Sequence, residues 1–549
     1  MYHLGKYLLC LVLGGGVFSA CSDKWDEHYQ SVQLGEGTLW QIMSQNPDLS
    51  NFMEVLDSCG YKSSLNGSQV FSVFAPVNSV LTPALRDSVI ALYQAQKSEG
   101  VKETRNAAVK EFVMNHVALY SHSVSSLTND SIVMMNGKYV LLTNKGFESG
   151  NFLSQNVLTK NGILFTVDKL ATYEPNIYEY LQRDGDLDSV RNYIYSYSLD
   201  VFNPAQSVPG EIKDGKTQYL DSVTYFDNEL LDYFLEAELN DEDSTYWLLA
   251  PTNQVWDSLL TEYTNYYQYD EKVIGRDSMM FNFPRLGILQ GTTFSLNVNK
   301  EQAIKDSIFS TLAYPFSYRK YVWGSSDLKY YQFDRPYDAG GIFEQTTDIA
   351  CSNGVVKKTD LWNVDKTNTF MKKIVMEGAS NATFDSVYSV NTRDPRGYYV
   401  ESTNPFYDKV YNNTYLEIAP TSTSNIQALF DIRNVLSNVP YDVYLVALPL
   451  TVQDTLANPV PTDFRATLFY HDNSGKEVNF PVTGKFTTKA AEIDTVFIGT
   501  YTFPTCSYGV DKPQVKMLVE GRTSATSVRQ GKATKTLLLD CIIFKPRFE

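Results

Sequence analysis

One stretch of the chain matches the letter pattern of a phosphate-binding loop. It covers residues 210–217 and ends in Lys216-Thr217. In a working loop of this kind, a buried strand leads into a helix whose N-terminus holds the phosphates. Here Pro204 and Pro209 precede the pattern and a strand-like run follows it. The context therefore predicts a β-hairpin turning near Asp214-Gly215 rather than a phosphate site.

The other possible catalytic or metal sites also fail in their sequence context. Aspartates alternate at 184–188 as in a calcium loop, but Ser189 and Tyr195 stand where Gly and Glu are needed. We interpret Asp186 and Asp188 as turn and helix-cap residues. The chain has no G-x-S-x-G, H-E-x-x-H or C-x-x-C motif, and the spacing of its 63 acidic residues selects no catalytic pair. We predict no catalytic residues, no metal and no cofactor.

Tyrosines supply the remaining candidate binding groups. The chain has 38 of them, and many gather in two stretches near 263–269 and 318–337. A tyrosine offers a sugar ring an apolar face and a hydroxyl group, although it serves equally to pack strands and bridge domains. The candidate ligand residues in these stretches are Tyr266, Tyr267, Trp323, Tyr330 and Tyr331.

Charge and length limit the class of protein. With 46 basic and 63 acidic residues the net charge is −17, so the basic footprint of a duplex nucleic-acid binder is missing and we predict no nucleic-acid partner. A length of 549 residues predicts about three or four domains.

The N-terminus reads as an export signal. Residues 1–20 hold one charged side chain, Lys6, and an apolar run too short to cross a bilayer. Small residues then precede Cys21, which is typical of a lipoprotein signal whose cleavage leaves an acylated cysteine; a plain secretory signal is the alternative. Residues 21–35 form the predicted tether. Its acidic start resembles the export tag of surface lipoproteins from gut glycan-degrading Gram-negative bacteria, which implies an outer-membrane protein facing the medium.

An internal repeat organises the next two-thirds of the chain. Three landmarks recur in the same order: a pair of short amphipathic helices, an apolar run ending in Ala-Pro-x-Asn, and an Asn-Gly turn before a strand. The offsets between the copies are 138, 175 and 192 residues, so the second copy has gained two insertions. The landmarks begin at Leu39, Val73 and Lys160 in the first copy and at Ile177, Leu248 and Ser352 in the second. Mixed helices and strands without a regular βαβ rhythm predict an α+β fold.

The repeated unit resembles the fasciclin domain family. Residues 71–78 and 161–168 are similar to its two signature segments, and Asn115-His116-Val117 with Tyr120 is similar to its central histidine segment. We place the first domain at 36–172 and a divergent second domain, which lacks that histidine, at 173–372. The resemblance implies wedges of β-sandwich and helices used for adhesion or binding, with His116 and Tyr120 as candidate ligand residues and no catalysis.

Residues 373–549 have a different pattern. Short runs of alternating or β-rich residues are separated by Pro, Gly, Asn and Asp turns, which predicts an all-β, jelly-roll-like sandwich. Residues 435–444 and 539–543 resemble a galactose-binding-type jelly roll. Such a domain binds sugar or only supports its neighbours, and both alternatives stay open. Cys506 and Cys541 could pair across the sandwich or remain free thiols.

Together these features favour a surface-anchored outer-membrane lipoprotein that holds a glycan or peptide beside a nutrient transporter. One alternative is an adhesin or structural subunit that contacts other proteins through its fasciclin domains. Another is a hydrolase hidden in the C-terminal sandwich.

Overall fold

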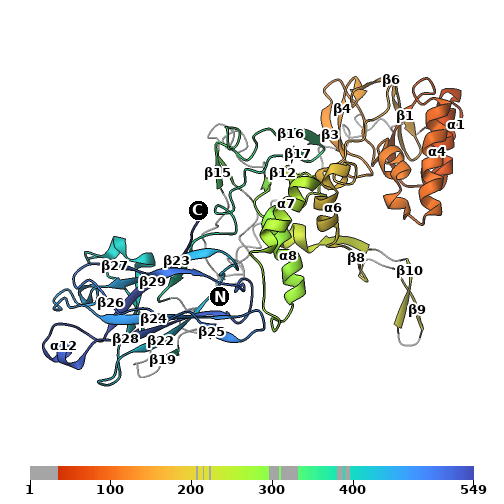
Figure 1. The fold of residues 1–549 in the computed structure, drawn as a ribbon. Coiled ribbons are helices and arrows are strands. Elements are labelled where there is room, and N and C mark those ends of the chain that lie inside the picture. The colour runs from red at the N-terminus through yellow and green to blue at the C-terminus, as the bar shows by residue number, and fades with distance from the viewer. Residues whose placement is uncertain are drawn as a thin grey trace, which may run out of the picture. The chain divides into compact units, whose positions relative to one another are not determined.

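The structure is a computed structural model that describes residues 35–205, 208–213, 216–221, 224–295, 308–310, 332–379, 388–389 and 396–548 (Figure 1). The chain divides into two compact units, Met1–Glu174 and Pro175–Glu549, and each is described by itself. The predicted lipidation residue Cys21 lies outside the described residues. Within the described ranges, every helix is too short or too polar to cross a membrane.

The first unit combines one sheet of seven strands with a set of short helices (Figure 1). The strand order is β2-β1-β7-β6-β5-β4-β3. The strands are β1 (Phe71–Pro76), β2 (Val117–Leu119), β3 (Asn129–Val133), β4 (Tyr139–Thr143), β5 (Gly146–Phe147), β6 (Gly150–Thr159) and β7 (Gly162–Val167). The helices are α1 (Leu39–Ser44), α2 (Ser50–Ser58), α3 (Lys62–Asn66), α4 (Pro83–Ser98) and a π-helical turn, η3 (Ala108–Val113).

Each face of the central strands in this unit has its own core. Val73 and Leu164 belong to the core shared with the helices, while Phe74 and Phe165 belong to a second core shared with β3, β4 and β5. The rings of Phe74 and Phe147 stack with centroids 4.0 Å apart, so the far end of the sheet folds back over β1. The predicted wedge of β-sandwich and helices is confirmed.

The second unit begins with a shorter version of the same arrangement. Its sheet has the strand order β13-β12-β17-β16. The helices are α5 (Ile177–Tyr180), α6 (Asp188–Tyr195), α7 (Asn253–Thr264) and α8 (Arg276–Leu289). The strands are β12 (Tyr246–Pro251), β13 (Thr293–Ser295), β16 (Thr347–Cys351) and β17 (Gly354–Thr359), with β14 (Ile308–Ser310) and β15 (Gln332–Asp334) forming a separate pair.

The two copies share the register of their central strands. In the first copy β1 runs parallel to β7 with Phe71 opposite Gly162. In the second, β12 runs parallel to β17 with Tyr246 opposite Gly354. These pairs stand at the offsets of 175 and 192 residues found in the sequence, so the predicted duplication is confirmed.

The asparagine of each Asn-Gly turn holds the first helix of its own copy. Asn161 Oδ1 accepts the backbone N–H of Leu39 at 2.8 Å, and Asn353 Oδ1 accepts that of Ile177 at 2.9 Å. Both asparagines are buried and also donate to backbone carbonyls through Nδ2. The turn that starts the last strand therefore also fixes the entry of the chain into the domain.

The first insertion of the second copy is a β-ribbon. Strand β8 (Ser198–Phe202) pairs with β11 (Thr224–Asn228), and β9 (Val208–Lys213) pairs with β10 (Lys216–Asp221) between them. The hairpin prediction is confirmed, because residues 210–213 of the phosphate-loop pattern lie on β9 and its last two residues begin β10, a strand where a working loop needs a helix. A π-helical segment, η5 (Leu230–Leu235), leads from the ribbon to β12.

The rest of the second unit is a sandwich of two six-stranded sheets, as predicted (Figure 1). One sheet has the order β20-β21-β29-β23-β27, with β18 also on β29; the other has the order β19-β22-β28-β24-β25, with β26 also on β24. The strands are β18 (Ile374–Glu377), β19 (Tyr388–Ser389), β20 (Arg396–Tyr399), β21 (Thr414–Ile418), β22 (Gln427–Ile432), β23 (Pro440–Leu448), β24 (Asp463–His471), β25 (Glu477–Asn479), β26 (Phe486–Thr487), β27 (Asp494–Thr502), β28 (Val515–Gly521) and β29 (Leu537–Pro546), and a short helix, α12 (Ala525–Arg529), precedes β29.

The second fasciclin-like region and the sandwich form one packed body. One hydrophobic core contains residues of both, from Ile177 to Phe544. Residue 373 therefore marks a change of fold class within one compact unit. Cys506 and Cys541 are both buried free thiols, so the disulfide alternative is not realised.

Candidate functional site

His116, a predicted ligand residue, lies inside the first copy. Its Nδ1 is 2.8 Å from the carbonyl of Phe112, and its Nε2 accepts the backbone N–H of Ala171 at 3.1 Å. Burial lowers the pKa of His116 to about 4, although the bond to Phe112 opposes the shift. The imidazole is therefore neutral, with its proton on Nδ1. The prediction that His116 contacts ligand is wrong, because the ring is fully buried and ties two backbone segments together.

The second copy has Thr292 at the place of this histidine. The carbonyl of His116 accepts the N–H of Phe74 on β1, and the carbonyl of Thr292 accepts the N–H of Leu249 on β12. Thr292 is also fully buried. The backbone role is kept in both copies while the side chain has changed, which fits a structural position.

Two predicted tyrosines lie at the junction with the sandwich. Tyr267 is buried, with its ring centroid 5.5 Å from Tyr508 and 5.8 Å from Phe370. The prediction that Tyr267 offers a ligand-binding surface is wrong, because core residues cover its ring. Tyr266 is half-buried; its hydroxyl donates to Glu262 at 2.7 Å and accepts from Lys366 at 2.9 Å.

These tyrosines belong to residues 265–276, which we name the joining segment. It links α7 to α8 and lies along loops of the sandwich. Backbone carbonyls of Tyr266 and Gln268 accept N–H groups of the sandwich at 2.9 and 2.6 Å, and the hydroxyl of Tyr269 donates to a sandwich carbonyl at 2.8 Å. The buried carboxylate of Asp270 lies 3.1 Å from Nδ1 of His471. The tyrosines here bridge domains, which was the alternative interpretation of their clustering.

Among the described residues, Tyr120 is the most exposed of the predicted ligand residues. Its side chain is 73% exposed, and its backbone has a φ of 67°. Ser72 Oγ donates to its carbonyl at 2.9 Å, which fixes this turn after β2. The remaining predicted ligand residues, Trp323, Tyr330 and Tyr331, lie outside the described residues.

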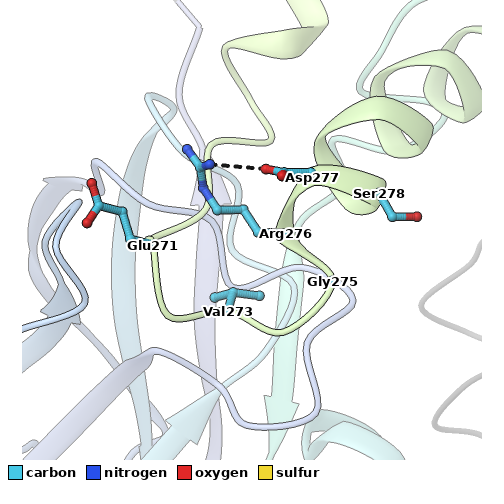
Figure 2. Close-up of a pocket in the computed structure, with 6 residues that line it drawn as sticks. All are labelled: Glu271, Val273, Gly275, Arg276, Asp277 and Ser278. Atoms are coloured by element: carbon cyan, nitrogen blue, oxygen red, sulfur yellow. Dashed lines mark hydrogen bonds and ion pairs between the residues drawn. The ribbon is translucent and has the colours of Figure 1, made fainter.

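A polar pocket of about 340 Å³ opens at the end of the joining segment, lined by Glu271, Val273, Gly275, Arg276, Asp277 and Ser278 (Figure 2). Arg276 donates through Nε to the carbonyl of Tyr269 at 3.1 Å, and its guanidinium pairs with Asp277 at 3.2 Å. The guanidinium of Arg276 is thus already bonded to neighbouring residues of the chain, Tyr269 and Asp277. In the described part of the chain, no three His, Cys, Asp or Glu side chains gather closely enough to hold a metal ion.

A larger candidate site is the outward side of the sheet formed by β22, β28 and β24, which we name the open sheet face. Alternate residues of these strands point inward to the shared core. The outward residues form three rows across the strands, and all but Thr467 are partly accessible. From one edge to the other the rows are Gln427-Glu520-Arg465, Leu429-Leu518-Thr467 and Asp431-Lys516-Phe469.

Hydrogen bonds hold the first row in place. Glu520 accepts from Arg465 Nε at 2.6 Å and from Gln427 Nε2 at 3.2 Å. The bond from Arg465 holds the pKa of Glu520 below its ordinary value despite partial burial. In the third row Lys516 pairs with Glu477 at 2.5 Å, and burial raises the pKa of Asp431 against the nearby charge of Lys516. An apolar strip therefore lies between two rows of oriented polar groups, each about 7 Å away along the strand.

The sequence predicted the strands of this face but not which of their side chains lie next to one another. Alternation within 427–432 predicted one inward and one outward side. The partners Arg465 and Glu520 were missed, because only the pairing register of β22, β28 and β24 brings them together. The opposite charges on alternating positions of two predicted strands are the signal that could have suggested this pairing.

Comparison with known families supports the resemblance of the first copy to the fasciclin domain. Residues 47–172 match the family model of the fasciclin domain, which agrees with the resemblance found from the motifs for residues 36–172. No curated protein matches the chain.

Solved structures are similar to two parts of the chain. A FAS1 domain pair from the insect cell adhesion molecule fasciclin I is 13% identical and covers 59% of this chain and 99% of that chain, with a TM-score of 0.20. A xylan-binding CBM22-1 domain from Paenibacillus barcinonensis is 11% identical and covers 32% of this chain and 92% of that chain, with a TM-score of 0.21. The CBM22-1 and GH10 modules of a Clostridium thermocellum xylanase, complexed with xylohexaose, are 11% identical with a TM-score of 0.21. There the match covers 32% of this chain and spans only 28% of that chain.

Proposed function

We propose that the protein is a non-catalytic, lipid-anchored protein of the outer-membrane surface that captures a glycan chain. The open sheet face carries the proposal. Sugar rings combine apolar C–H faces with a rim of hydroxyl groups, and binding sites for such ligands combine apolar surface with a few fixed polar groups. Leu429 and Leu518 supply the apolar strip, and the rows on either side supply donors and acceptors.

The fixed geometry of the first row favours a neutral sugar. Arg465 and Glu520 satisfy each other, so the row presents planar donors and acceptors without a free charge. A ligand hydroxyl can donate to a remaining lone pair of Glu520 and accept from the guanidinium. Since the groups are already held in place, little side-chain entropy is lost on binding.

Anchoring is the part of the proposal that comes from the sequence. Cys21 follows small residues and an apolar run, and an acidic tether follows it. Acylation of that cysteine would keep the captured glycan at the outer leaflet, next to a transporter that imports it. We infer this accessory role from the export tag.

Glycan capture is tested by affinity electrophoresis of the mature protein in gels containing single neutral or acidic polysaccharides. We expect retardation by at least one polysaccharide, and loss of one charge-assisted hydrogen bond in Arg465→Ala should weaken it about tenfold. Tyr399→Ala changes an exposed residue on the other sheet and is the matched control. Absence of binding to every polysaccharide would contradict the proposal, and binding to peptides alone would replace its ligand.

Anchoring is tested in cells by labelling with a radioactive fatty acid. The wild type should incorporate label and be digested by protease added to intact cells. Cys21→Ala should lose the label. An unlabelled wild-type protein retained in the periplasm would contradict the surface location.

A further inference from the structure

The β8–β11 part of the ribbon inserted into the second copy has one face with exposed apolar side chains. In the β8–β11 ladder, Val201 lies opposite Tyr225 and Leu199 opposite Asp227, so these four side chains share one face. Leu199 is 58% exposed and Tyr225 50%. We name these four residues the ribbon face.

The opposite side of the ladder fixes the ribbon to the domain. Phe226 packs edge-on against Tyr178, with ring centroids 5.5 Å apart. Tyr178 in turn stacks on Tyr195 and hydrogen-bonds Ser198 at 2.7 Å. Because one side is held by these contacts, the ribbon face is held outward.

The fold itself does not require this ribbon. In the first copy the chain passes from α2 to β1 through the short helix α3, and the central strands keep the same register without any ribbon. The exposed apolar residues of the ribbon face therefore have no counterpart role in packing a fasciclin domain. Exposed apolar residues gathered on an added element are typical of an interaction surface.

An acidic run follows the ribbon face along the chain and limits what can cover this face. Residues 227–243 contain eight acidic side chains and no Lys, Arg or His. Asp227 belongs to the ribbon face, and its charge adds to burial in raising the pKa of Asp232. Burial, Asp241 and Asp232 likewise raise the pKa of Glu238. These carboxylates repel one another, so a cationic surface would relieve that repulsion.

A second copy of this chain does not fit. Each copy carries a net charge of −17, and pairing two ribbon faces would bring their acidic runs together. A basic partner with an exposed apolar patch satisfies both features of the surface.

We propose that the ribbon face, with the acidic run beside it, is the docking surface for a separate protein that presents a basic surface with an apolar patch. This interaction is distinct from glycan capture, because it uses the fasciclin-like part of the second unit. It gives the protein a contact through which it joins a larger assembly.

The test uses the full-length protein in its own cells, with a photo-crosslinking phenylalanine derivative incorporated in place of Tyr225. We expect one dominant conjugate with a protein whose surface is basic, identified by mass spectrometry. The double variant Asp232→Lys and Glu238→Lys should reduce the yield about tenfold, and 0.5 M salt should reduce it likewise, because both remove the attraction between exposed charges. Both changes are at exposed side chains, and thermal unfolding checks that the fold is kept.

A probe incorporated in place of Tyr399 on the sandwich is the matched control and should not give this conjugate. The proposal is overturned by the absence of any conjugate, by a conjugate of two copies of this chain, or by a conjugate that survives charge reversal. Glycan retardation separates the two proposals. Arg465→Ala should leave the conjugate unchanged, and the double variant Asp232→Lys and Glu238→Lys should leave retardation unchanged.

Discussion

The two fasciclin-like copies share one frame and differ in what is attached to it. Both have a capping box at the first helix, a buried Asn-Gly turn and parallel central strands in the same register. The first copy fills its far side with its own strands β3 to β6. Among its described residues the second copy has fewer strands there, and it shares a core with the sandwich, through residues such as those of the joining segment that have no equivalent in the first.

This difference separates the residues that the fold of the domain requires from those that make contacts beyond it. The glycine of the turn is the same in both copies because its φ near 145° and a carbonyl oxygen close by leave no room for a Cβ. The asparagine is the same because its side chain accepts the N–H that begins the first helix. The joining segment and the ribbon occur only in the second copy, and both make or offer contacts beyond the domain. New contacts have thus been added outside an unchanged frame.

The largest expected effect tests whether the frames are equivalent. A Cβ on Gly162 would lie 1.8 Å from the carbonyl oxygen of Phe71, and one on Gly354 would lie 1.8 Å from that of Tyr246, both at φ near 145°. We expect Gly162→Ala and Gly354→Ala each to cost about 4 kcal/mol or more. Calorimetry should show Gly162→Ala lowering the transition of the first unit and Gly354→Ala that of the second. Gly100→Ala, in open space at φ 79°, is the control and should cost much less.

The second prediction concerns the core that the second copy, unlike the first, shares with the sandwich. Tyr267→Ala removes a buried ring between the joining segment and the sandwich, and we expect it to destabilise the second unit by about 3 kcal/mol. Urea unfolding followed by fluorescence and calorimetry measures the loss. If the shared core makes the second unit unfold cooperatively, Tyr267→Ala should lower the midpoint of its single unfolding transition or split that transition into two. A change no larger than that of the exposed control Tyr120→Ala would contradict the shared core.

The two units should also respond to pH in opposite directions. The pKa of His116 is lowered to about 4 by burial, so the first unit should be fully stabilised above its unfolded pKa near 6.5 and lose stability as the pH falls toward 4. We expect a loss on the order of 2 kcal/mol. His116→Asn should flatten this dependence, as measured by the pH profile of the first transition. An unchanged profile in the variant would assign the dependence to other groups.

In the sandwich, Asp540 acts in the opposite sense. Burial and the charge of Glu377 raise its pKa to about 7, against the N–H of Tyr411 that its Oδ1 accepts at 3.0 Å. The folded state therefore holds a proton that the unfolded chain releases near pH 4, and stability falls as the pH rises from about 4 to about 7. Asp540→Asn keeps the acceptor for the N–H of Tyr411. At pH 8 it should raise the free energy of unfolding of the second unit by about 2 kcal/mol. A variant less stable than the wild type at pH 8 would show that the carboxylate is needed.

Much of the frame could be predicted from the sequence because its determinants are local. Asn-Gly turns, Ala-Pro strand ends and helix caps involve residues within a few positions of one another, and their order revealed the duplication. The roles of the tyrosines could not be predicted in this way. Tyr267 and its partner Tyr508 are 241 positions apart, and no local pattern indicates that a strand-end loop of the sandwich covers that ring.

The candidate site was harder to predict for the same reason. Arg465 and Glu520 lie on neighbouring strands, and a shift of one residue in register would have turned one of them into the core. His116 shows the converse error. Its place in a segment similar to the fasciclin histidine segment suggested contact with a ligand, but complete burial with two backbone partners makes it part of the core.

The smallest expected effect concerns the caps of the two first helices. Thr38 accepts the N–H of Gln41, and Asn176 at the equivalent position accepts that of Glu179 at 2.9 Å. Thr38→Ala should therefore cost about 1 kcal/mol in the first unit. Thr38 Oγ1 donates one further bond, to the exposed Asn66 at 2.7 Å. Asn176 is buried, and its Nδ2 donates both to Glu242 at 2.9 Å and to the carbonyl of Asn240 at 3.1 Å, so Asn176→Ala should cost more in the second unit.

Asn176→Asp separates these two contributions. It keeps the capping oxygen but loses the donor and places a second carboxylate beside Glu242, so it should destabilise the second unit although Asp is a good cap in isolation. Chemical denaturation of each variant gives the comparison. Equal losses in Thr38→Ala and Asn176→Ala, with Asn176→Asp neutral, would mean that both copies use the cap alone. A larger loss in Asn176→Ala, shared by Asn176→Asp, would mean that the amide donor of Asn176 helps to tie the acidic run to the frame, beside the bonds that Asn353 makes to the carbonyls of Leu239 and Asp241.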